Sequence, residues 1–137
     1  MSSNAGLCPL AVDRWTPFVR ILTFKGVNLT GATLHAQVRV TADAPGDPLI
    51  DLPPTSTPGV EGIRLVSVDT TGVVPVSTVE MRIAAASLAN SAKAPSAPPS
   101  ATGSDVTLAW DLHVTPSGGD KQRWLYGPFV IVAGVTR

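Results

Sequence analysis

The side chains that most often carry out chemistry in proteins are scarce in this sequence. It contains two histidines, His35 and His113, and one cysteine, Cys8. Asp111 and His113 are two residues apart, so a strand would present both on one face, and Asp120 follows in the next turn. Carboxylates and imidazoles grouped in this way can bind a cation, but no further ligand at a fixed spacing completes the set. We therefore predict no metal site and no cofactor, and we expect both histidines on solvated strand faces.

Sequence signatures of catalysis are equally sparse. The chain has no glycine-rich phosphate loop, no cysteine pair at metal spacing and no histidine-glutamate zinc motif. No motif marks a serine nucleophile, and the enzymatic alternative is a hydrolase built on His35, His113 and Asp111. Cys8 precedes Pro9, and no charged residue lies nearer to it in sequence than Asp13. The sequence therefore shows none of the positive charge that activates a thiol. We expect a protein that is not an enzyme.

Three of the aromatic residues are candidates for an interface. The sequence has only three tryptophans, one tyrosine and three phenylalanines. Trp15, Trp124 and Tyr126 lie at the starts of expected strands or near a turn, where exposed rings anchor protein interfaces or stack on sugars. The alternative is that Trp15 and Trp124 close the two ends of a hydrophobic core. Both interpretations stay open at the level of sequence.

Composition narrows the classes of partner. Ten basic and ten acidic residues give a formal net charge of zero, and charged residues make up 15% of the chain, against about 25% in typical domains. Nucleic acids and anionic membranes attract clustered positive charge, so we expect neither partner. No apolar run approaches the length of a membrane span. The N-terminus lacks the pattern of a secretory signal, so we expect folding in the cytosol. A sparsely charged surface favours self-association.

The elements that must position these residues are predominantly strands. Thirteen prolines and twelve glycines divide the 137 residues into short runs rich in Val, Ile, Leu and Thr. Residues 32–40 and 105–115 alternate between apolar and polar side chains, which is typical of half-buried strands. Further strands are expected at 15–24, 49–52, 62–69, 73–83 and 123–133, with Gly127-Pro128 breaking the register of the last. Residues 84–92 are the one expected helix, and it is short.

These elements predict an all-β fold consisting of a single antiparallel β-sandwich with at most one short helix. We expect residues 1–14 to form a flexible N-terminal segment and residues 15–137 to form the domain. Residues 93–104, rich in Pro, Ala and Ser, carry no large apolar side chain. We expect them to form an exposed loop or an extended arm.

The order of several short motifs resembles that of small bacteriophage and prophage tail proteins, akin to the immunoglobulin-like N-terminal domain of upper-baseplate proteins. The resemblance spans about residues 21–137. Its matching residues are Leu29-Thr30-Gly31-Ala32, Gln37-Val38-Arg39, Trp110-Asp111-Leu112, Gly127 and Val135-Thr136-Arg137. Two features depart from the pattern: the insertion at 93–104 is longer, and Trp110 replaces a tyrosine.

The resemblance implies an immunoglobulin-like sandwich that serves as a structural part of a phage tail, at the tail tip or baseplate. It implies assembly in the host cytoplasm with other tail proteins, and copies arranged as a homo-oligomer, with a trimer as the expected form. Two alternatives remain. One is a virion module that binds a host receptor or carbohydrate, with Trp124 and Tyr126 as its platform. The other is a capsid decoration or head–tail joining protein.

Overall fold

The computed structural model describes residues 6–41, 45–92 and 106–132, and within these ranges it contains nine β-strands and one α-helix. The strands are β1 (Gly6–Leu7), β2 (Leu10–Asp13), β3 (Phe18–Lys25), β4 (Thr33–Arg39), β5 (Ile50–Leu52), β6 (Gly62–Asp69), β7 (Val76–Ile83), β8 (Val106–Thr115) and β9 (Gln122–Val132). The helix is α1 (Ala85–Ala92). An all-β fold with one short helix is therefore confirmed.

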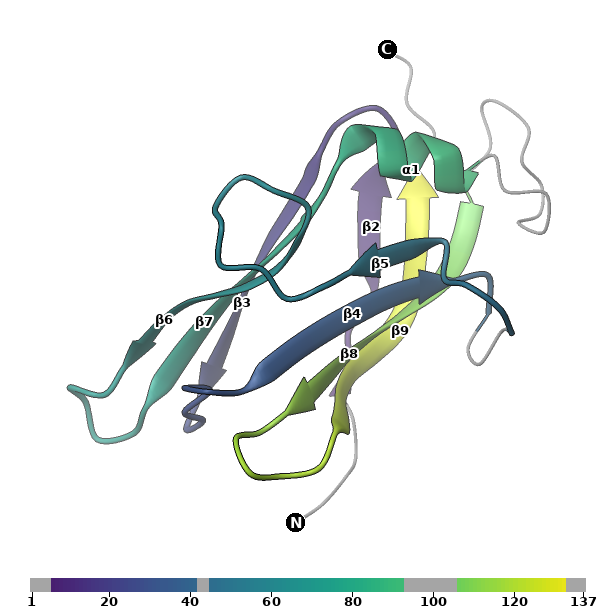
Figure 1. The fold of residues 1–137 in the computed structure, drawn as a ribbon. Helices are drawn as coiled ribbons and strands as arrows, with labels where there is room; N and C mark the ends of the chain where they lie inside the picture. The colour runs from purple at the N-terminus through teal and green to yellow at the C-terminus, as the bar shows by residue number, and fades with distance from the viewer. Residues whose placement is uncertain (1–5, 42–44, 93–105, 133–137) are drawn as a thin grey trace.

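The strands form two sheets, which Figure 1 shows as two layers. The larger sheet has the order β1-β9-β8-β4-β5, with β2 also paired to β9, and the smaller sheet has the order β3-β7-β6. All pairs are antiparallel except those that join β1 and β2 to β9. In the immunoglobulin fold, strands B, E and D share one sheet, and C′, C, F and G share the other. The order of strands β3 to β9 matches this scheme, and a β-sandwich is confirmed.

The core lies between the two sheets, where the alternation of each strand directs its apolar side chains. In β8 every second residue is buried, namely Val106, Leu108, Trp110, Leu112 and Val114. Those side chains pack in one cluster with buried residues of the smaller sheet, among them Val79 and Met81 of β7. The inward side of β8 is the side that its alternation predicted.

The N-terminal segment corrects one expectation. Residues 6–13 are not a flexible extension, because β1 and β2 pair with β9, and Leu10 and Val12 are buried in the core. The link between the two strands is fixed as well. The indole Nε1 of Trp110 donates a hydrogen bond of 2.8 Å to the carbonyl oxygen of Cys8. Gly127 permits this approach, since a Cβ at that position would lie 2.9 Å from the same oxygen.

The register of β9 also differs from expectation. Gly127 and Pro128 pair in sequence with Trp110 and Ala109, so the ladder to β8 continues through them. The shift lies instead beside Leu112 and His113, where Trp124 is an extra residue in β9. Proline is tolerated at position 128 because it lies opposite the interruption between β1 and β2, where the ladder on that side is already broken.

Among the described residues, the segments between the strands agree with the expectations from the sequence. Pro75 immediately precedes β7, which is a position where a missing N–H costs no ladder bond. Helix α1 follows β7 and buries Leu88 completely. Across the described residues, no helix is long and apolar enough to cross a membrane. The expected arm at 93–104 lies outside the described residues.

Candidate functional site

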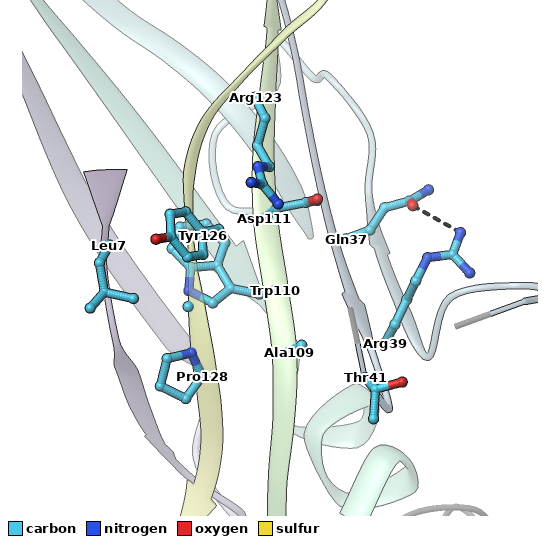
Figure 2. Close-up of a pocket in the computed structure, with 11 residues that line it drawn as sticks. Leu7, Gln37, Arg39, Thr41, Ala109, Trp110, Asp111, Arg123, Tyr126 and Pro128 are labelled. Atoms are coloured by element: carbon cyan, nitrogen blue, oxygen red, sulfur yellow. Dashed lines mark hydrogen bonds between the residues drawn. The ribbon is translucent and has the colours of Figure 1, made fainter. Parts of the chain in front are cut away.

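A hollow with apolar and charged lining lies on the outer face of the larger sheet, across β1, β9, β8 and β4. Its volume is about 290 Å³. Figure 2 shows the side chains that line it. Leu7, Ala109, Tyr126 and Pro128 form an apolar floor, while Gln37, Arg39, Asp111 and Arg123 supply the polar and charged groups. The remaining lining residues are Thr41, Trp110 and Gly127.

A β-bulge in β9 determines which side chains reach the hollow. The extra residue at Trp124 places Arg123 and Tyr126 on the same outer face, although they are three positions apart. The guanidinium carbon of Arg123 lies 4.7 Å from the centre of the Tyr126 ring, which is a cation–π contact. Without the bulge, the two side chains would face opposite sides of the sheet. The bulge therefore creates the charged, aromatic end of the hollow.

The opposite end of the hollow is held by a chain of hydrogen bonds on β4 and β5. Arg39 donates to the carbonyl oxygen of Gly46 and, over 3.1 Å, to Oε1 of Gln37, as the dashed line in Figure 2 shows. The Gln37 amide then donates to Oδ1 of Asp51 over 2.9 Å. His35 Nε2 lies 2.6 Å from the same carboxylate oxygen. The guanidinium of Arg39 is thus fixed in orientation at the rim.

The environment of Asp51 favours its charged form. Burial by itself would raise its pKa, but hydrogen bonds from Gln37 and His35 and the charges of His35 and Arg39 act in the opposite direction. The net result is that the pKa of Asp51 lies below its ordinary value. The carboxylate therefore remains an acceptor for the β4 side chains throughout the neutral and mildly acidic range.

The two histidines lie side by side on this face. His35 and His113 are directly opposite each other on β4 and β8, and both are half-buried, on the polar side as expected. His113 Nε2 lies 3.3 Å from Asp111 Oδ2, while Asp120 lies in the exposed connection to β9. Within the described ranges, no three His, Cys, Asp or Glu side chains are grouped so that they could hold a metal ion.

The three aromatic candidates are separated by the fold. Trp124 points inward, packs against the core and meets the Phe24 ring edge-on at 5.5 Å, so it closes one end of the sandwich. Tyr126 lines the outer hollow, on the opposite face of the sheet. Trp15 is half-buried in the turn after β2 and is not part of the hollow. Trp124 and Tyr126 therefore cannot form the joint platform that the carbohydrate alternative assumed.

The first motif of the resemblance to tail proteins, Leu29-Thr30-Gly31-Ala32, forms the turn that leads into β4. Leu29 is buried, and its N–H donates to the Ser77 hydroxyl over 3.0 Å, while that hydroxyl donates to the Val27 carbonyl over 2.7 Å. Gly31 has a φ of 78°, which favours glycine, and it closes the turn into β4. Residues 29–32 thus set the start of β4 and so the position of Gln37 and Arg39 along the hollow.

Sequence reasoning did not identify Leu7, Ala109, Arg123 or Pro128 as site residues. None of them belongs to a motif, and they meet only because β1, β9, β8 and β4 are neighbours. No protein-family model matches the chain, and no curated protein matches its sequence.

Proposed function

We propose that this chain is a non-enzymatic structural component of a bacteriophage tail, located at the tail tip or baseplate. Its role is to dock neighbouring virion proteins, and the outer hollow of the larger sheet is the docking site. Assembly takes place in the host cytoplasm and the protein stays in the finished particle. No bond is made or broken; the activity is the burial of complementary surface.

One observation carries this proposal. Five residues on which the resemblance to tail proteins rests line the same hollow, namely Gln37, Arg39, Trp110, Asp111 and Gly127. They come from three strands and from positions up to 90 residues apart (Gln37 to Gly127). Trp110 and Gly127 also hold the N-terminal segment against β9. Gln37, Arg39 and Asp111, in contrast, direct their side chains to the outer face. Their convergence supports a shared role at that surface.

The chemistry of the hollow suits a protein partner. Tyrosine and arginine are over-represented among residues that dominate binding energy, particularly where they surround an apolar centre. Here Tyr126 and Arg123 stack on each other beside Leu7, which is 64% exposed. Burial of that leucine and of the Tyr126 ring would make the free energy of docking favourable.

The proposal is tested by introducing a charge into the hollow of the phage-encoded protein. Ala109→Glu places a carboxylate on the apolar floor, and we expect mass spectrometry of purified particles to show loss of the protein. Thr23→Glu is the matched control, because Thr23 is exposed on β3 of the other sheet. Equal retention of both variants in particles would contradict the docking role. Absence of the wild-type protein from particles would contradict the virion role itself.

A further inference from the structure

The turn between β6 and β7 carries a second unusual surface feature. Val73 is fully exposed and Val74 is 48% exposed, so two adjacent branched apolar side chains project into solvent. Figure 1 shows this turn at one end of the sandwich, at the tip of the β6–β7 hairpin. Exposed apolar side chains are common singly, but an apolar pair at the tip of a hairpin has no role within the fold.

The shape of this turn is fixed by an aspartate at its base. Oδ1 of Asp69 accepts hydrogen bonds from the backbone N–H of Thr71, at 2.9 Å, and from its hydroxyl, at 2.6 Å. These bonds hold the first half of the turn and so reduce the conformational freedom that this half would lose on docking. They also keep a negative charge next to the two valines. The tip, defined as residues 69–74, thus combines two exposed valines with one carboxylate at the base of the turn.

The outer hollow has the complementary properties. Its floor is apolar, and its volume of about 290 Å³ is about twice the ~150 Å³ cavity that accepts a benzene molecule. Two valine side chains together contain as many carbon atoms as benzene. At the rim, no carboxylate among the described residues lies within ion-pair distance of the Arg123 guanidinium. The hollow therefore offers an apolar cavity with one cation available at its edge.

We propose that the tip of one copy of this chain inserts into the hollow of a second copy, with Val73 and Val74 on the apolar floor and Asp69 facing Arg123. This inference rests on the proposed role of the hollow as a docking site and names its occupant.

The resulting contact is head-to-tail, because the tip and the hollow are different surfaces on different sheets. Contacts of this kind repeat from copy to copy and produce closed rings or open chains, not two-fold dimers. The expectation of a cyclic homo-oligomer is compatible with a ring. A second copy is favoured over an unrelated partner because both halves of the contact, an apolar tip with a carboxylate and an apolar hollow with a cation at its edge, are present on one chain. The low content of charged residues also favours self-association.

The test uses two variants that each remove one half of the contact. Val73→Asp destroys the apolar tip and leaves the hollow intact, while Ala109→Glu destroys the hollow and leaves the tip intact. We expect the wild-type protein to exceed the mass of one chain by light scattering after size exclusion, and each variant alone to have the mass of one chain. Mixing the two variants should restore a species of two chains, since one intact tip and one intact hollow remain.

Controls separate this result from damage to the fold. Val60→Asp changes another exposed valine outside both surfaces, and we expect it to assemble like the wild type. Asp69→Asn keeps an oxygen that can accept from Thr71 but removes the charge, and we expect about tenfold weaker association at low salt. Circular dichroism melting curves should show that all variants remain folded.

Three outcomes would overturn the inference. They are a wild-type protein that is monomeric at high concentration, variants that assemble as well as the wild type, and a mixture that remains monomeric although each variant is folded. These outcomes are distinct from failure of the virion role. A monomeric protein that is nevertheless found in particles overturns the self-association alone, whereas an assembling protein that is absent from particles overturns the virion role alone.

Discussion

At the scale of single residues, the most consequential position is Gly127, where the N-terminal segment crosses β9. Gly127→Ala would place a methyl group 2.9 Å from the Cys8 carbonyl oxygen, which the Trp110 indole also contacts. We expect a loss of about 1–3 kcal/mol in the free energy of unfolding, because a backbone contact this close cannot relax locally. Urea unfolding followed by tryptophan fluorescence measures it. Gly6→Ala, where the nearest atom is 3.5 Å away, is the control and should change little.

Ser77 tests a second residue-level claim, that a buried hydroxyl holds the turn before β4. Ser77 is fully buried, and Ser77→Ala would leave the Leu29 N–H and the Val27 carbonyl without their partner. The expected cost is about 1–3 kcal/mol, as is typical for unsatisfied buried groups. The same unfolding measurement applies, with exposed Ser67→Ala as its control. Equal stability of the two variants would show that the hydroxyl is not needed.

At the scale of elements, the bulge in β9 places two nearby aromatic side chains, Trp124 and Tyr126, on opposite faces of the sheet. Trp124→Ala removes a ring that packs on Phe24 at the end of the core, so we expect a loss of about 2–4 kcal/mol in stability. Tyr126→Ala removes a ring on the outer face, so stability should fall by less than about 1 kcal/mol while docking is weakened. Thermal unfolding together with the light-scattering assay distinguishes the two effects. A stable Trp124→Ala variant would contradict the inward position of that ring.

The pairing of β4 with β5 depends on pH through Asp51. Because the folded-state pKa of Asp51 lies below its ordinary value, the unfolded chain takes up a proton first as the pH falls. The contribution of Asp51 is therefore complete above its ordinary value of 3.8 and is lost as the pH falls through the lower folded pKa. Asp51→Asn should flatten the pH dependence of stability below about pH 5. Unchanged slopes in acid unfolding curves would contradict the role of this carboxylate.

At the scale of the whole molecule, the sequence predicted the parts of the fold that depend on local pattern. The alternation at 32–40 and 105–115 identified β4 and β8 and the side of each that faces the core. The N-terminal strands were missed because β2 has only four residues and its partner, β9, lies more than a hundred residues away. The pattern of neighbouring residues cannot predict a pairing between segments that far apart in the sequence.

The candidate site was predictable only in part for a related reason. Tyr126 was proposed as an interface residue from its chemistry, and Trp124 was grouped with it because both lie near the start of an expected strand. A strict alternation would place the two side chains on one face of the sheet. The bulge at Trp124 changes that, and it has no signature in composition. The hollow itself exists only when β4, β8, β9 and β1 lie next to one another. Strand order is a property of the assembled sandwich.

The central claim, that this sandwich is a tail component, is tested most directly by immunogold electron microscopy of intact particles from a culture that produces the phage. The protein is expected to be labelled at the distal end of the tail, at the tip or baseplate. Label on the head would assign it to capsid decoration or head–tail joining. Particles without label, from which the protein is also missing by mass spectrometry, would contradict a virion role altogether.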